Sequence, residues 1–216
     1  MTLPEHRLDS TVFLSKLITQ YARLHEKTAG PVAKEYIRQL GIRTGEWIEG
    51  FYEQDIPEPW SLNDYVDVII DLKNSIGGHF EVSEVHPDHV VVKAGRCPFG
   101  DAVKDAPHLC MMTSSVFGGI GARKFGYAKV NLRKRIALED DGCEVAIYFE
   151  PTDKEEGEVY KDLPITPKQG NPFSWEEDAI VMLNEELHRS DKMIEQLLGE
   201  LESLRNEVDQ LKEKNR

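Results

Sequence analysis

The stretch AKVNLRKRIALEDDGCEVAIYF, residues 128–149, decides the fold of this chain. Every second residue from Ala128 to Leu132 is apolar and the residues between them are polar or charged, which is typical of an antiparallel strand with one buried face. The turn residues Asp140-Asp141-Gly142 predict a tight hairpin, and residues 143–149 predict its return strand. The sequence therefore predicts an antiparallel β hairpin here.

A second hairpin and four helices are predicted before it. Residues 80–92 predict two strands that turn at His86-Pro87-Asp88, and Pro107 suits the first turn of a helix that runs to about Phe125. Residues 10–53 predict two helices broken at Gly30-Pro31, and residues 61–76 a third that Ser61 caps. The fold class is therefore α+β, with N-terminal helices and an antiparallel sheet of two hairpins around a central, glycine-rich helix.

Each of the first two helices carries an apolar stripe, the pattern of a helix that buries one face. The stripes consist of Phe13, Leu17, Tyr21 and Leu24 in the first helix, and of Ala33, Ile37, Leu40, Trp47 and Phe51 in the second.

The C-terminal residues repeat in heptads. One seam position is taken by Ile180, Leu187, Ile194, Leu201 and Val208, and the other by Leu183, Leu197, Leu204 and Leu211, with Ser190 as the polar break. β-Branched residues at the first position and leucine at the second favour two parallel strands. We therefore expect a homodimer through a parallel coiled coil that leads to an output domain or a partner protein. The sequence ends inside a heptad, so we expect the natural polypeptide to continue.

These patterns predict three parts: an α+β domain over residues 1–150, an acidic, proline-containing linker over 151–172, and the coiled coil over 173–216. The net charge of −13 argues against direct nucleic-acid binding, which requires a basic surface. There is no apolar run of membrane-spanning length and no signal peptide. We therefore expect a cytoplasmic protein without a membrane partner.

Three cysteines are the candidate chemical groups. Cys97 is predicted in a loop, Cys110 near the start of the central helix, and Cys143 at the start of a strand. Their wide spacing is unlike that of a zinc finger, and each could simply be buried as a small apolar residue. A helix N-terminus favours a thiolate at Cys110. The candidates for a fourth metal ligand are His108, His89, His79, an acid such as Asp101, or water.

The central helix contains Gly118, Gly119 and Gly121, although glycine lowers helix stability by about 1 kcal/mol per residue. Either another backbone packs closely against the helix or a ligand cavity lies beside it, and close packing is the favoured interpretation. If a cavity for a small apolar ligand lies there, its candidate walls are Phe99, Met111, Met112, Phe117, Gly118 and Gly119.

The segments Cys97-Pro98-Phe99-Gly100, Pro107 to Met112, the glycine-rich helix, Gly126 to Val130 and Asp141-Gly142-Cys143 resemble the methanogen-output-type domain. That family in turn resembles the four-vinyl-reductase-type sensor domains. The latter resemblance implies a cysteine-rich zinc site beside a hydrophobic pocket, with Cys110 and Cys143 matching its first and last cysteines. The Glu and the Cys expected shortly before the last cysteine are missing here, where Leu132 to Ile136 stand.

The resemblance and the cysteines together predict a sensory or regulatory domain that detects a small ligand, a metal or a redox state and signals through the coiled coil. Zinc is the favoured metal for Cys97, Cys110 and Cys143, and an iron–sulfur cluster is the alternative. Two other functions are compatible with the sequence. One is a zinc hydrolase with three cysteine ligands, and the other is a non-catalytic coiled-coil scaffold with structural cysteines.

Overall fold

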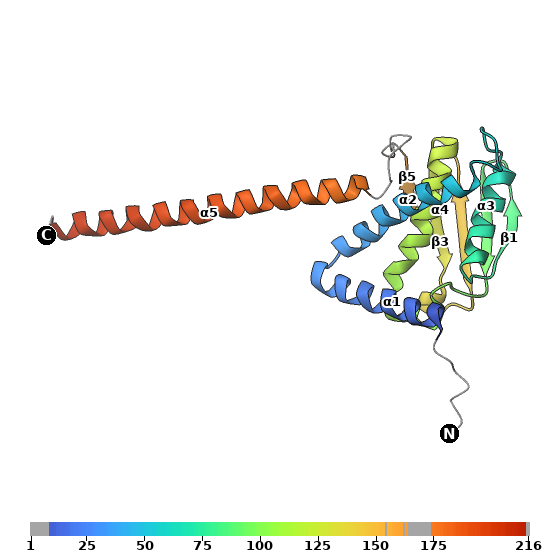
Figure 1. The fold of residues 1–216 in the computed structure, drawn as a ribbon, viewed down its shortest axis with the longest axis horizontal. Coiled ribbons are helices and arrows are strands. Elements are labelled where there is room, and N and C mark those ends of the chain that lie inside the picture. Colours follow the sequence, from blue (N-terminus) through green and yellow to red (C-terminus); the bar gives the residue numbers. More distant parts are fainter. Residues whose placement is uncertain (1–8, 154, 162, 164–173, 215–216) are drawn as a thin grey trace, which may run out of the picture. The chain divides into compact units, whose positions relative to one another are not determined.

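The structure is a computed structural model that describes residues 9–153, 155–161, 163 and 174–214 (Figure 1). The chain divides into two compact units, Met1–Pro167 and Lys168–Arg216. The first unit has the predicted α+β fold, and the second contains one long helix, α5 (Ser174–Lys214). Among the described residues, no helix has both the length and the apolar character that crossing a membrane would require.

The first three helices of the first unit begin and end close to the predicted residues, whereas the fourth begins at Cys110 rather than at Pro107. α1 (Ser10–Ala29) and α2 (Val32–Tyr52) are separated at Gly30, whose φ of 62° suits glycine. α3 (Leu62–Ser75) begins at a capping box, in which Ser61 and Asp64 satisfy each other's backbone N–H groups. Two short 3₁₀ helices, η1 (Gly100–Asp105) and η2 (Pro107–Leu109), lead into α4 (Cys110–Phe125).

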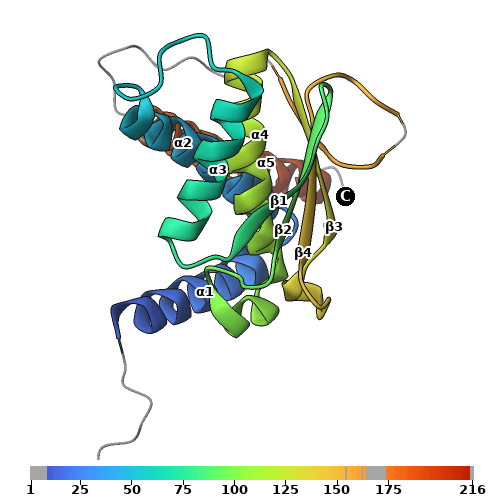
Figure 2. The same ribbon diagram turned by 90° about the vertical axis from the view of Figure 1, so that its right-hand side faces the viewer.

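The sheet has five antiparallel strands in the order β1-β2-β4-β3-β5. Their bounds are β1 (Phe80–Val85), β2 (His89–Ala94), β3 (Ala128–Lys134), β4 (Cys143–Tyr148) and β5 (Glu158–Tyr160). Both predicted hairpins form, and β2 pairs with β4 to join them into one sheet. The helices α3 and α4 lie on one face of this sheet (Figure 2).

Close packing explains one glycine in each of the helices α2 and α4. A Cβ atom on Gly41 would lie 2.5 Å from Cβ of Ser115, and one on Gly118 would lie 2.1 Å from the ring of Tyr160. Real Cβ contacts are not this short, so only glycine lets the backbone of α2 and the ring of Tyr160 approach α4 at these positions. At Gly118 the close neighbour is thus a side chain rather than the backbone that the favoured interpretation expected, whereas a Cβ atom on Gly119 would lie 3.4 Å from Cα of Ile42 in α2.

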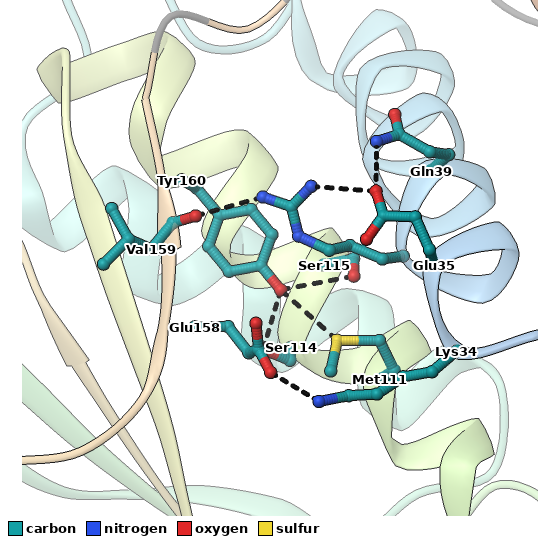
Figure 3. A network of polar contacts seen from close by, with 10 residues as sticks. Lys34, Glu35, Gln39, Met111, Ser114, Ser115, Glu158, Val159 and Tyr160 are labelled. Carbon is teal, nitrogen blue, oxygen red and sulfur yellow. Dashed lines mark hydrogen bonds and ion pairs between the residues drawn. The ribbon is translucent and has the colours of Figure 1, made fainter. Parts of the chain in front are cut away.

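The prediction of a linker over residues 151–172 is wrong in one part. Strand β5 lies within this stretch and hydrogen-bonds to β3. Tyr160 is fully buried, and its ring lies between α2 and α4 (Figure 3). Lys34 of α2 donates a hydrogen bond to Glu158, and Arg38 donates one to the carbonyl oxygen of Val159. The folded unit thus extends past residue 150.

The apolar stripe of α1 lies on the opposite side from the core. Its four residues are more than half exposed, whereas Thr19 and Ala22 on the other side are buried. Ala22 packs in a cluster with Val103 of η1 and Leu109 of η2, so small residues rather than large apolar ones make the contact. The predicted stripe is therefore a free surface in the single chain.

The prediction of a helix in the C-terminal part of the chain is confirmed by α5 over residues 174–214. The predicted seam residues Leu187, Ile194, Leu197, Leu201 and Leu204 are exposed in the single chain. The side chains of Ile180, Leu183, Val208 and Leu211 lie outside the described residues. Pairing of this helix with a second copy stays a prediction.

Candidate functional site

The three cysteines line one cavity of about 30 Å³. Cys97 lies in the loop after β2, Cys110 is the first residue of α4, and Cys143 is the first residue of β4. The pairing of Cys143 with Ala94 places β4 beside the end of β2, and η1 and η2 return the chain to Cys110. The remaining wall is formed by Phe80, Pro98, Phe99, Val103, Leu109, Thr113, Leu132, Lys134, Arg135 and Val145.

A buried lysine, Lys73 of α3, accompanies the cysteines, and the sequence analysis missed it. Its side chain is 4% exposed, and its Nζ donates a hydrogen bond to Thr113 Oγ1 at 2.9 Å. Nζ also lies 5.3 Å from the ring centroid of Phe117 and 5.8 Å from that of Phe80. No carboxylate among the described residues pairs with it. The sequence did contain a signal for this burial. Lys73 stands four residues after the buried Ile69, so it lies on the apolar face of α3.

Burial dominates the titration of this group of side chains. Burial lowers the pKa of Lys73 to about 8, and the nearby thiols of the three cysteines raise it in part. Burial raises the pKa of Cys110 to about 11, with a further contribution from Cys97 and Cys143, and burial also raises the pKa of Cys97. A raised pKa favours the protonated thiol at Cys110, so burial opposes the thiolate that the start of α4 was expected to favour.

The donor set fits a thiophilic metal ion in its chemistry. Three thiols around one small cavity are ligands that Zn²⁺ and iron–sulfur clusters prefer. Their sulfur atoms do not form a group in which all lie within 4.8 Å of one another, so ligation would require the cysteine side chains to turn inward. A volume of about 30 Å³ suits one ion or water, whereas an apolar molecule would require the cavity to widen.

Of the other predicted site residues, Phe99 lines this cavity, and Phe117 lies behind its wall, where its ring contacts Phe80 and Nζ of Lys73. His108 and Met111 line a different cleft, of about 270 Å³. Both ring nitrogens of His108 are buried and have no hydrogen-bond partner among the described residues, although Nδ1 lies 3.3 Å from Oε2 of Glu26. The remaining candidates, Met112, Gly118 and Gly119, line neither the cavity nor the cleft.

A second group of metal-ligating side chains lies on the hairpin between β1 and β2. Ligand atoms of Glu84, His86 and His89 lie within 4.8 Å of one another. The two imidazole rings stack with their centroids 4.5 Å apart, and Asp88 Oδ1 lies 2.9 Å from Nδ1 of His89. Glu84 and His86 are exposed, so this group serves below as a control for metal binding.

The lowered pKa of Lys73 predicts how the stability of the folded chain depends on pH. The folded chain loses the Lys73 proton near pH 8 and the unfolded chain near pH 10.5, so the unfolded state holds more protons between these values and stability rises with pH there. Lys73→Met removes this contribution. We expect the unfolding free energy of Lys73→Met minus that of the wild type to fall by about 1.4 kcal/mol from pH 7 to pH 9, because only the wild type gains stability over this range. Urea unfolding of both proteins checks this, and a pH-independent difference would contradict it.

Residues 52–148 match the family model of methanogen output domain 1, and the matched residues include Lys73 and all three cysteines. The match supports a methanogen-output-type domain over these residues, while the relation to four-vinyl-reductase-type domains stays a prediction. None of the curated proteins matches the chain.

Two solved structures resemble the chain at low identity. One is a trafficking protein particle complex subunit 3 from Naegleria fowleri covalently bound to palmitic acid, with a TM-score of 0.49, 14% identity, and coverage of 66% of this chain and 99% of that one. The other was solved for probing the function of heme distortion in the H-NOX family, with a TM-score of 0.39, 12% identity, and coverage of 79% and 81%.

Proposed function

We propose that this chain is a non-catalytic sensory domain whose sensing site is the cavity lined by Cys97, Cys110 and Cys143. The observation that carries the proposal is that three thiols from distant parts of the chain line one small cavity, and that a buried lysine, Lys73, hydrogen-bonds to Thr113 of its wall. Perturbed titratable groups in a cavity are a physical reason to assign a function to it. The family match over residues 52–148 agrees with a sensory output-type domain.

Charge favours zinc as the group that is sensed. A buried ammonium without an anionic partner is unfavourable by several kcal/mol, and within the part of the chain that the structure describes, Lys73 has only the hydroxyl of Thr113 as its hydrogen-bond partner. Three cysteine thiolates with Zn²⁺ carry one net negative charge, and Lys73 would neutralise it. The resident lysine therefore suits an anionic metal–thiolate group better than a neutral apolar ligand.

The cavity is connected to the helices on the outside of the domain. Val103 and Leu109 line the cavity and also pack with Ala22 of α1 and Ile37 of α2. A change in the cysteine side chains would therefore press on α1 and α2 through η1 and η2. We include in the proposal that the signal leaves through a dimeric coiled coil of α5 to an output domain or partner protein.

The decisive experiment is zinc titration of the full chain purified in reduced form. We expect about one equivalent of Zn²⁺, and we expect Cys110→Ser to weaken binding at least 100-fold because a thiolate ligand is lost. The stoichiometry is checked by elemental analysis after dialysis, and circular dichroism verifies that the variant folds.

Two matched controls separate the sites. His86→Ala removes a ligand from the hairpin group, and His108→Asn alters the neighbouring cleft, so both should leave the affinity of the cysteine site unchanged. Loss of zinc in His86→Ala with full retention in Cys110→Ser would overturn the cysteine site as the metal centre. Absence of zinc binding to every protein would leave only a thiol redox or ligand site to be tested.

A further inference from the structure

An apolar surface on α1 and α2 remains uncovered in the single chain. We name it the α1–α2 face and define it by its exposed apolar residues, which are Phe13, Leu17, Tyr21, Leu24, Val32, Tyr36, Leu40, Trp47 and Phe51. Solvent-exposed helix residues are usually polar, so a row of aromatic and aliphatic side chains along two successive helices needs a partner.

The two helices form one surface rather than two separate stripes. Tyr21 stacks with His25 at a centroid distance of 6.0 Å, and His25 contacts the ring of Tyr36 at 5.3 Å. These rings join the exposed apolar residues of α1 to the exposed apolar residues of α2 beside Gly30, where the helices meet before they diverge (Figure 1). Farther along α2, Trp47 and Phe51 pack edge to face at 5.0 Å.

The size of the face suits a protein–protein interface. Five of its residues are aromatic, and they are between 49% and 69% exposed. A fully covered aromatic side chain buries about 150–250 Å², so the face offers roughly 800 Å² per copy once the aliphatic residues are included. The largest apolar patch of an ordinary monomer is about 300–600 Å², whereas a standard interface buries about 800 Å² on each partner.

The charges beside the face are self-complementary. Lys16, Arg23 and Lys27 follow one side of α1 at intervals of seven and four residues, and all three are exposed, although Lys16 also pairs with Asp105 of η1. Glu35 of α2 and its C-cap residue Glu53 lie on one side of that helix, separated by five helical turns, and are also exposed, although Glu35 also pairs with Arg38. A two-fold axis that places α1 of one copy beside α2 of the other would set the basic side against the acidic side.

We propose that the α1–α2 face is an isologous interface with a second copy of this chain. The area and the two opposite charge rows carry this proposal, and it does not depend on the coiled coil of α5. Because Ala22 and Ile37 support the two helices from the side of the cysteine cavity, the interface lies within reach of a change in that cavity.

The test uses the full chain with Leu197→Lys and Leu204→Lys, which removes pairing through the α5 seam. Sedimentation velocity is measured at protein concentrations from roughly 1 to 100 µM. This range covers the dissociation constants of the weaker interfaces of this size. We expect a reversible dimer, and we expect Tyr36→Glu or Leu17→Glu to raise its dissociation constant at least about tenfold. Val85→Glu, which alters a comparably exposed apolar residue on β1, should leave the constant unchanged.

Three outcomes would overturn the interface. One is a monomer at every concentration, and the second is a dimer that responds to Val85→Glu but not to the variants of the face. The third is a monomer that co-sediments with phosphatidylcholine vesicles and loses this binding in Tyr36→Glu, because the occupant would then be lipid. All the variants replace exposed side chains, and thermal unfolding verifies that each one folds.

Discussion

Tyr160→Ala is expected to lower the free energy of unfolding by about 3–5 kcal/mol, the range for truncating a buried aromatic side chain. The Tyr160 ring is fully buried, and the guanidinium of Arg38 lies 4.8 Å from its centroid. Its hydroxyl pairs with Ser114 Oγ at 2.9 Å and Ser115 Oγ at 3.3 Å, and also contacts the sulfur of Met111. Chemical denaturation of the wild type and the variant measures the loss.

Gly118 provides a sharper form of the same test, because a methyl group there would occupy the position of the Tyr160 ring. Gly118→Ala should destabilise the wild type by about 1–3 kcal/mol through overpacking. In the Tyr160→Ala background the same substitution should stabilise by about 1 kcal/mol, because alanine is the better helix former and the ring is gone. A double-mutant cycle measures this change of sign. Equal effects in both backgrounds would contradict the contact and the place of β5 in the fold.

Glu49→Ala is expected to lower the free energy of unfolding by about 3–5 kcal/mol, because it leaves a buried cation without its partner. Arg123 of α4 donates a hydrogen bond from Nε to Glu49 Oε1 at 2.8 Å, and Nζ of Lys124 lies 3.5 Å from Oε2. All three side chains are largely buried. Burial raises the pKa of Glu49, and the charges of Arg123 and Lys124 lower it in part.

Two variants on α2 control this prediction. Glu49→Gln keeps the shape and an acceptor for Arg123, so it should have an intermediate effect. Glu35→Ala removes an exposed ion pair with Arg38 and should change stability by less than about 1 kcal/mol. If Glu49→Ala and Glu35→Ala have the same effect in urea unfolding, the pair between α2 and α4 does not contribute to the core.

Local sequence was sufficient for most of the secondary structure. The alternation from Ala128 to Leu132, the turn at Gly142 and the capping residue Ser61 each act within a few residues, and each predicted element is present. The three residues of β5 carried no such signal, because a strand this short in an acidic, proline-containing stretch is stabilised only by its pairing with β3 and the burial of Tyr160.

In the candidate site, too, the sequence predicted some features and only the tertiary structure revealed others. The cysteines were recognisable as chemical groups, yet only the pairing of Cys143 with Ala94 and the return of the chain through η1 and η2 bring them to one cavity. Lys73 was not recognised from the sequence, and His108 was grouped with the cysteines although it lines another cleft. Proximity between residues far apart in the chain cannot be inferred from their spacing.

The sequence by itself determined the order of the α-helices and of the first four strands, and the heptads of α5, because backbone hydrogen bonding, capping and periodic apolar residues are local properties. Tertiary structure alone decided which side of α1 is buried, why Gly118 must lack a side chain, and which residues surround the cysteines. The physical reason is that burial depends on what packs against a residue. A leucine or tyrosine in an apolar stripe, such as Leu17 or Tyr21, therefore marks a surface that needs a partner, without stating whether the partner is the same chain or another.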